Sequence, residues 1–302
     1  MATKTAHSAE RVWFITGASS GFGHAVSRAV LQRGERVVAT GRELDELGAL
    51  VAEFSGRALA LRLDVTNAAA ARETVNQAVR HFGRLDVVFN NAGYGQVGAV
   101  EELTDEELRR QLDVNLLGVI HVTRAALPHF RNERRGHFVQ MSSLNGIEGL
   151  PGGACYTASK FAVEGFSESL AAEVAPLGIH VTIVEPGPFR TRFLDTSARW
   201  AKPIPDYADS VGKAREMLRQ LNGKQPGDPA RAARAILGAV DADKPPLRLP
   251  LGRMAFEHIR ARFGARLAEL DTAAELGMAT DFPTEGASPS ERVEASRPAR
   301  AR

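Results

Sequence analysis

The sequence lacks cysteine pairs, long apolar runs and a dominant sign of charge. Its single cysteine, Cys155, excludes a disulfide framework and makes a reducing, cytoplasmic setting the default expectation. The apolar run VWFI at 12–15 is too short for a signal-peptide core. No stretch approaches the roughly 18 apolar residues of a membrane span. We therefore expect a soluble protein with no membrane span.

The charged residues and histidines exclude further classes. The formal net charge is +2 and the basic residues are scattered, whereas a nucleic-acid partner requires a basic face or groove. The eight histidines show no metal-type spacing such as HExxH, so no metal is expected. With 44% hydrophobic and 25% charged residues, the chain has the composition of a globular protein with a substantial core.

Short β-branched runs alternate with longer amphipathic stretches along most of the chain. This order predicts an α/β fold with a single doubly wound parallel sheet and helices on both faces. Asn67 is expected to cap one helix, and Thr104 with Glu107 to form a capping box on another. The predicted strands are 12–16, 36–40, 58–63, 85–90, 136–141, 178–184 and 247–251, and the predicted helices are 21–33, 43–54, 67–82, 104–130 and 155–175.

The sheet accounts for a domain over residues 10–252. Within it, the segment 188–228 breaks the regular alternation of strands and helices. A C-terminal helical extension is expected over 253–284, with a helix near 254–274. The last segment, 285–302, is rich in Pro, Ser and Arg and has little apolar mass, so it is predicted to be disordered.

A glycine-rich turn follows the first strand directly. The stretch TGASSGFG places Gly17, Gly21 and Gly23 where a tight turn opens a helix. Such a turn lets the backbone approach a pyrophosphate, and the helix N-terminus supplies free N–H groups. Ser19, Ser20 and Phe22 complete this predicted phosphate-binding loop.

The same stretch also contains GASSG, a formal match to the GxSxG nucleophile elbow of α/β-hydrolases. That elbow follows several earlier strands, whereas only about a dozen residues precede this turn. The position therefore favours a phosphate-lining role for Ser19 over a nucleophilic one.

The ends of the next three strands predict the rest of a dinucleotide site. After the second strand, Gly41 stands where an acidic residue would bind a free ribose 2′-hydroxyl. Arg42 follows, and a guanidinium binds a 2′-phosphate, so NADP(H) is favoured over NAD(H). Asp64 and Val65 follow the third strand, where the carboxylate either accepts from the adenine amino group or forms a turn. Small residues follow the fourth strand, and Asn91, Ala92 and Gly93 would let the backbone pass close to the cofactor.

These motifs, with Asn115, Ser143, the pair Tyr156-x-x-x-Lys160 and PGPFRT at 186–191, resemble the short-chain dehydrogenase/reductase family. The resemblance spans about residues 10–190, in order and in spacing. It implies a Rossmann-type domain holding both cofactor and substrate. It also implies hydride transfer between NAD(P) and a hydroxyl or carbonyl group, and a homodimer or homotetramer.

The resemblance assigns a role to each of its polar residues. Tyr156 would be the general acid and base, because a carbonyl accepting hydride needs a proton donor. Lys160, one helical turn away, would lower the pKa of Tyr156 together with the oxidised nicotinamide, and it would hold the nicotinamide ribose. Ser143, rather than Ser142, lies at the family's spacing from Tyr156 and would be the second donor to the substrate oxygen. Asn115 interrupts a predicted helix, which suggests a local distortion, with its backbone or its side chain holding a relay water near Lys160.

The remaining cofactor and substrate residues come from the same motifs and from 188–228, which is the variable substrate lid in the family. The backbone at Pro186 and Gly187 would run close to the nicotinamide, and the Thr191 side chain would bind the nicotinamide carboxamide. The lid is rich in apolar residues, which favours a hydrophobic alcohol or ketone, although Arg190 and Arg192 leave an acidic substrate open. A nucleotide-sensing Rossmann protein without catalysis is the alternative function. The expected substrate contacts are Tyr94, Leu144, Phe189 and Phe193.

Overall fold

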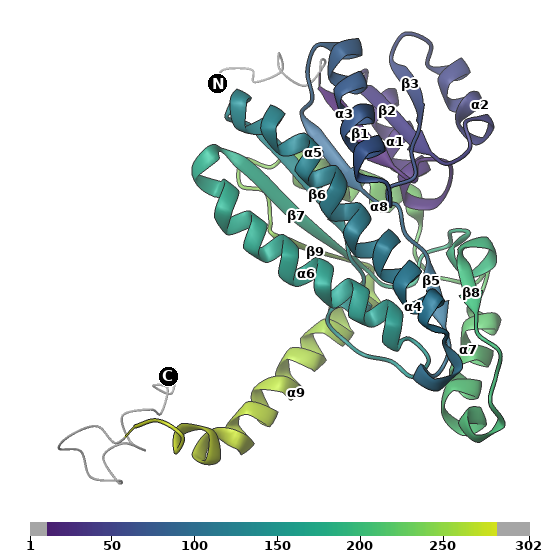
Figure 1. Cartoon of the computed structure of the whole chain (residues 1–302), viewed down its shortest axis with the longest axis vertical. Helices are drawn as coiled ribbons and strands as arrows, with labels where there is room; N and C mark the ends of the chain where they lie inside the picture. The colour runs from purple at the N-terminus through teal and green to yellow at the C-terminus, as the bar shows by residue number, and fades with distance from the viewer. Residues whose placement is uncertain (1–10, 283–302) are drawn as a thin grey trace. The chain divides into compact units, whose positions relative to one another are not determined.

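A seven-stranded parallel sheet forms the centre of the fold in the computed structural model, which describes residues 11–282. Its strand order is β3-β2-β1-β4-β6-β7-β9, and each neighbouring pair is parallel (Figure 1). The predicted fold class is therefore confirmed. The strands are β1 (Val12–Thr16), β2 (Arg36–Gly41), β3 (Ala58–Arg62), β4 (Val87–Asn90), β6 (Gly136–Met141), β7 (Ile179–Pro186) and β9 (Arg248–Leu251).

Helices cover both faces of this sheet, as Figure 1 shows for α3, α5 and α6 over one of them. Each face has its own buried apolar cluster, since parallel strands alternate side chains between two dry layers. One cluster includes α1 (Gly21–Gln32), α2 (Asp45–Glu53) and α8 (Pro229–Asp241). The other includes α3 (Ala68–Phe82), α5 (Gly118–Glu133) and α6 (Ala154–Val174).

The sequence analysis did not predict α8, although its start carries a clear signal. The Asp228 side chain accepts a hydrogen bond from the Ala230 N–H at 2.8 Å, and Pro229 takes the first helical position. The two predicted caps are confirmed: Asn67 accepts from the Ala70 N–H at 2.9 Å, and Thr104 forms the capping box with Glu107.

The predicted single helix over 104–130 is divided in two. It consists of α4 (Asp105–Leu112), a π-helical turn (Asp113–Leu117) and then α5. The turn contains Asn115, so the predicted distortion is confirmed at that residue. A π-helical turn inserts a residue into the helical hydrogen-bond ladder and often marks a functional position.

A second, small sheet was not predicted. It pairs β5 (Gly95–Val97) with β8 (Ala198–Trp200), and α7 (Lys213–Leu221) follows it. A buried ion pair of 2.6 Å between Arg215 and Glu102 ties α7 to the turn after β5. Short 3₁₀ turns occur at Val100–Glu102, Leu144–Gly146, Ala175–Leu177 and Pro205–Tyr207, and π-helical turns at Phe193–Ser197 and Ala208–Gly212.

The predicted C-terminal helix is present as α9 (Arg253–Met278). Its first turns belong to the compact unit that ends at Arg260, where Ala255 and Ile259 are buried with Leu144 and Ile147. Residues from Ala261 onward form a second unit. The predicted disordered segment 285–302 lies outside the described residues. Among residues 11–282, no helix combines the length and apolar character that crossing a membrane requires.

Candidate active site

A cavity of about 1370 Å³ lies at the carboxyl ends of the central strands. In open α/β sheets this edge holds the ligand, at the point where the strand order reverses. Here the order reverses between β1 and β4. All of the predicted site residues line the cavity except two, Gly23 and Asn115.

The glycine-rich loop is built by close backbone contacts. Gly17 has a φ of +63°, and a Cβ there would lie 3.0 Å from the Ala92 Cα. A Cβ on Gly23 would lie 2.2 Å from the Gly17 carbonyl oxygen, so Gly23 allows helix and strand to pack. Ser20 caps α1 without a side-chain hydrogen bond, which leaves N–H groups of the first turn for an anionic ligand. Among residues 11–282, no hydrogen bond joins Ser19 to a histidine, as a nucleophile elbow would require.

Thr16 fixes this loop to the neighbouring strand end, a role that the sequence analysis missed. Its Oγ1 accepts hydrogen bonds from the backbone N–H groups of Asn91 at 2.9 Å and Ala92 at 3.0 Å. In return, Asn91 Nδ2 donates to the carbonyl oxygens of Thr16 at 2.9 Å and Gly17 at 3.0 Å. The Asn91 side-chain amide therefore holds the glycine-rich loop in place. In the sequence, the one indication of this role is that Thr16 directly precedes the first glycine of the loop.

Two cations and a carboxylate stand at the end of the cavity beside β2 and β3. Arg42 is exposed there, and Arg110, which the sequence analysis did not single out, joins it from α4. Asp64 accepts from the Thr66 N–H at 3.0 Å and hydroxyl at 2.8 Å, so it forms the turn that the sequence left open. Burial acts to raise the pKa of Asp64, but the Thr66 hydrogen bonds, Arg110 and Arg42 outweigh it and lower the pKa.

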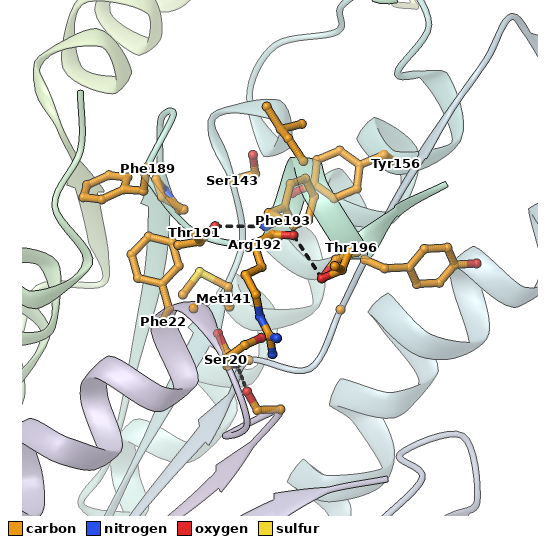
Figure 2. Close-up of a pocket in the computed structure, with 18 of the residues that line it drawn as sticks. Ser20, Phe22, Met141, Ser143, Tyr156, Phe189, Thr191, Arg192, Phe193 and Thr196 are labelled. Carbon is orange, nitrogen blue, oxygen red and sulfur yellow. Dashed lines mark hydrogen bonds between the residues drawn. The ribbon is translucent and has the colours of Figure 1, made fainter. Parts of the chain in front are cut away.

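Ser143, Tyr156 and Lys160 meet at the other end of the cavity, where Figure 2 shows Ser143 near the Tyr156 ring. Lys160 is 4% exposed, and its Nζ donates to the Met141 carbonyl oxygen at 2.7 Å. The same Nζ lies 5.8 Å from the centre of the Tyr156 ring. Ser142 is also buried, but Ser143 is the serine whose side-chain hydrogen bond lowers the pKa of Tyr156.

Burial opposes ionisation of both Tyr156 and Lys160. Burial raises the pKa of Tyr156 to about 12, and the interaction with Ser143 opposes this only in part. Burial also lowers the pKa of Lys160 to about 8. The protein groups alone therefore do not lower the pKa of Tyr156, and the predicted lowering, which invokes Lys160 together with the oxidised nicotinamide, stays a prediction. The physical reason is that both groups are desolvated while the ammonium is directed to the Met141 carbonyl.

Asn115 is fully buried and its side chain is occupied by the protein. Its Nδ2 donates to the Tyr94 carbonyl at 2.9 Å and the Ser159 hydroxyl at 3.2 Å, and its Oδ1 accepts from the Tyr94 N–H at 3.1 Å. A Cβ on Gly93 would lie 3.2 Å from Asn115 Oδ1 and 3.8 Å from Lys160 Nζ, so the three groups are neighbours. Both Nδ2 hydrogens of Asn115 are therefore used, whereas its Oδ1, which has a second lone pair, and its backbone can each hold a water.

Aromatic rings from the segment 188–228 border the reactive end. Phe193 packs on Tyr156 with ring centres 5.7 Å apart, and Phe189 packs on Phe22 of the glycine-rich loop at 5.0 Å (Figure 2). The Thr191 hydroxyl accepts from the Phe193 N–H at 3.3 Å, which shapes the turn between them. Further apolar side chains line the cavity, namely Leu150, Met217, Leu218, Leu221 and Met254.

The arginines of this segment separate in space. Figure 2 shows the Arg192 side chain pointing toward Ser20 of the glycine-rich loop. Arg190 instead donates to the Gln225 carbonyl oxygen at 3.2 Å and does not line the cavity. Arg192 thus adds a cation at the end of the cavity beside the glycine-rich loop, a placement that was not predicted from the sequence.

Within residues 11–282, Cys155 and the histidines add no further reactive or metal-binding centre. Cys155 is buried, burial raises the pKa of its thiol, and its Sγ lies 3.9 Å from the Leu108 carbonyl oxygen. Such a thiol acts as a small apolar filler. Over the described range 11–282, no group of three or more His, Cys, Asp or Glu is placed to hold a metal ion.

Comparison with known proteins gives one consistent family. The family described as short chain dehydrogenase matches residues 11–202. Oxidoreductase BOA17 of Botryotinia fuckeliana is 40% identical over 82% of this chain and 91% of its own length. A 3-ketodihydrosphingosine reductase of Bacteroides thetaiotaomicron is 38% identical over 80% of this chain and 88% of its own length.

Solved structures agree with the sequence relatives. A short-chain dehydrogenase from Streptomyces avermitilis is 42% identical, with a TM-score of 0.85 over 90% of this chain and all of its own. An alcohol dehydrogenase from Thermococcus sibiricus, complexed with 5-hydroxy-NADP, is 26% identical, with a TM-score of 0.66 over 80% of this chain and 96% of its own.

Proposed function

Because this chain belongs to the short-chain dehydrogenase family, an oxidoreductase family with nicotinamide-bound structural neighbours, we propose that it transfers hydride between NADP(H) and a hydrophobic alcohol or ketone. The observation that carries this proposal is the meeting of Ser143, Tyr156 and Lys160 at one end of the cavity, with the glycine-rich loop along the same strand edge. A non-catalytic nucleotide sensor has no use for all three side chains.

Each of these residues has a chemical task in the proposal. The bound cofactor supplies hydride to the carbonyl carbon in reduction and removes it in oxidation. Tyr156 gives its proton to the carbonyl oxygen in the first direction and recovers it in the second. The Ser143 hydroxyl donates a hydrogen bond to the same oxygen as negative charge develops on it. A protonated Lys160 stabilises the tyrosinate that remains.

The proton that Tyr156 gives up has to be replaced from solvent. Both Nδ2 hydrogens of Asn115 are used by Tyr94 and Ser159, and we assign the water-holding role to the Asn115 backbone carbonyl, because the π-helical turn interrupts the helical hydrogen-bond ladder there. The closeness of Gly93, Asn115 and Lys160 supports this assignment. The relay would then run from that water through Lys160 to Tyr156.

The cavity residues fit a dinucleotide with a 2′-phosphate. The uncapped N-terminus of α1 and the side chain of Arg192 suit the pyrophosphate. Arg42 and Arg110 place two guanidinium groups where the adenosine ribose would lie, and a guanidinium binds phosphate bidentately. Val65, Ala92 and Gly93 provide the small surfaces along which the adenine half would pass. These charges favour NADP(H) over NAD(H).

We further propose that the segment 188–228 is a lid that selects the substrate. Phe193 lies on the Tyr156 ring, so it would contact a group bound to the reacting carbon. Tyr94, Leu144 and the apolar side chains from α7 extend this surface, which suits a bulky hydrophobic molecule. The relative named as a 3-ketodihydrosphingosine reductase acts on a substrate of that character. We expect a cytoplasmic homodimer or homotetramer.

The test is cofactor turnover by the purified protein. NADPH and NADH are each offered with long-chain, steroid and aryl ketones, and oxidation is followed by absorbance. We expect turnover with NADPH, and we expect Arg42→Ala to raise its KM about tenfold, as loss of a charge-assisted contact implies, with NADH unaffected. Arg62→Ala, an exposed arginine outside the cavity, is the matched control. Tight NADPH binding with no turnover on any ketone would favour the sensor instead.

A further inference from the structure

One helical turn after Lys160, α6 carries a second buried ionisable side chain, Glu164. It is 5% exposed, and residues four apart on a helix share one face. Burying a carboxylate away from water is strongly unfavourable unless a cation or hydrogen bonds compensate. The position of Glu164 therefore requires an explanation in terms of the charges around it.

The Glu164 carboxylate lies at the same strand end that holds Lys160. A Cβ on Gly146 would lie 2.4 Å from the Ser142 Oγ and 3.0 Å from Glu164 Oε1. The two oxygens therefore lie close to the same side of that glycine. Ser142 directly follows Met141, whose carbonyl oxygen accepts the 2.7 Å hydrogen bond from Lys160 Nζ. Glu164 and Lys160 thus approach the end of β6 from successive turns of one helix.

The charged groups around Glu164 include more carboxylates than guanidinium groups. Arg248 on β9 lies 3.5 Å from Glu164 Oε2 and 3.5 Å from Oε1 of Glu185, which is 1% exposed on β7. Arg248 makes its shortest contact, 2.8 Å, with the exposed Glu168. One guanidinium is therefore shared among three carboxylates. Lys160 is the further cation on the same helix face.

We propose that Glu164 is the buried counter-charge of Lys160 and acts as a positioning residue that keeps the lysine protonated. The electrostatics of the two groups are reciprocal in direction. Burial lowers the pKa of Lys160, and Glu164 is the charge that opposes this. Burial raises the pKa of Glu164, and a hydrogen bond from Ser142, the charge of Arg248 and then the charge of Lys160 oppose that. Each group thus stabilises the ionised form of the other.

The consequence for catalysis rests on the proposed oxidoreductase function. A neutral Lys160 does not stabilise tyrosinate, so activity falls as pH rises through the pKa of the lysine. Without Glu164, that pKa is lower and the fall begins at a lower pH. Glu164 therefore sets the basic limit of the working range without touching substrate.

The test reads Lys160 directly and does not depend on turnover. The chain has six lysines, so the ¹³Cε signal of Lys160 in lysine-labelled protein is assigned by its loss in Lys160→Met. We expect Glu164→Gln to move the Lys160 titration about one pH unit toward acid, as removal of a nearby opposite charge does. Glu164→Asp retains the charge and restores most of the shift. Glu168→Gln removes the exposed carboxylate on the same arginine and leaves the Lys160 midpoint where it was.

An unchanged Lys160 midpoint in Glu164→Gln would overturn the proposal, even if the enzyme is active. Should that variant not fold, reciprocity supplies the second measurement. In glutamate-labelled protein, Lys160→Met raises the pKa of one buried carboxyl, and the absence of any such change would equally contradict the pairing. Where a ketone substrate is turned over, the basic limb of the kcat/KM profile shifts toward acid in Glu164→Gln and not in Glu168→Gln.

Discussion

Lys160 Nζ donates a 2.7 Å hydrogen bond to the carbonyl oxygen of Met141 at the end of β6. This bond fixes the lysine to the strand that leads into Ser143, while α6 carries Tyr156 one turn earlier. The three polar groups are therefore positioned by one helix and one strand end rather than by a mobile loop. Sites held in this way keep the geometry that proton transfer requires.

The two adjacent serines after β6 predict different kinetic losses. Ser143→Ala removes a donor to the developing oxyanion, so kcat falls about 10²-fold. Ser142→Ala removes a hydroxyl beside Glu164, so kcat falls less than about tenfold. Steady-state kinetics of both variants checks this. Equal losses in kcat would contradict the assignment of Ser143.

Glycine is required at one position of the loop helix and replaceable in another helix. Gly23→Ala places a Cβ 2.2 Å from the Gly17 carbonyl oxygen, so the loop and α1 must separate. We expect a loss of at least about 2 kcal/mol in the free energy of unfolding and loss of NADPH binding. Gly48→Ala in α2 meets no atom within 4 Å and should be stabilising by about 0.5–1 kcal/mol. Urea unfolding and fluorescence titration distinguish these outcomes, and tolerance of Gly23→Ala would refute the packing argument.

The Thr16 hydroxyl predicts a coupled loss of stability and cofactor affinity. Thr16→Val leaves the N–H groups of Asn91 and Ala92 without their acceptor, at about 1–3 kcal/mol for each that stays unsatisfied. Because these residues border the loop, the Kd for NADPH should rise as well. The control is Thr40→Val, whose hydroxyl makes a single 3.2 Å bond to the Ile15 carbonyl. Unchanged NADPH affinity in Thr16→Val would separate Thr16 from the site.

Glu185 predicts a pH dependence of stability. Burial raises its pKa to about 7 in the folded chain, above the model-peptide value of about 4.5, so the folded state binds the proton more tightly. The stability that this supplies is complete below about pH 4.5 and is lost as pH rises toward 7, at most about 3 kcal/mol. In Glu185→Gln that loss is absent. Urea unfolding of both proteins at pH 5 and pH 8 measures this change in the free energy of unfolding. An equal decrease from pH 5 to pH 8 in both proteins would show that Glu185 does not cause it.

Local features of the site could be predicted from sequence because short-range geometry determines them. The glycines of TGASSGFG, the four-residue separation of Tyr156 and Lys160, and the irregular helix at Asn115 each express a constraint within one turn or strand. The parallel sheet with helices on both faces follows from the alternation of strands and helices with right-handed crossovers.

What the sequence did not reveal depends on contacts between distant segments. β5 and β8 are three residues each and pair across about a hundred positions, so neither has a periodicity to read. Arg110 and Arg192 reach the cavity from α4 and from the turn after β7, which no local pattern indicates. The raised pKa of Tyr156 likewise arises from burial in the assembled fold.

Tyr156→Phe tests the central claim most directly, since it removes one oxygen atom and retains the ring that packs against Phe193. The measurement is single-turnover reduction of an accepted ketone by enzyme-bound NADPH, with the NADPH affinity of each protein determined alongside. The account predicts a rate lower by about 10³-fold at nearly unchanged NADPH affinity, because only the proton donor is lost. A rate within a few-fold of the unaltered enzyme would contradict it and would place the general acid elsewhere.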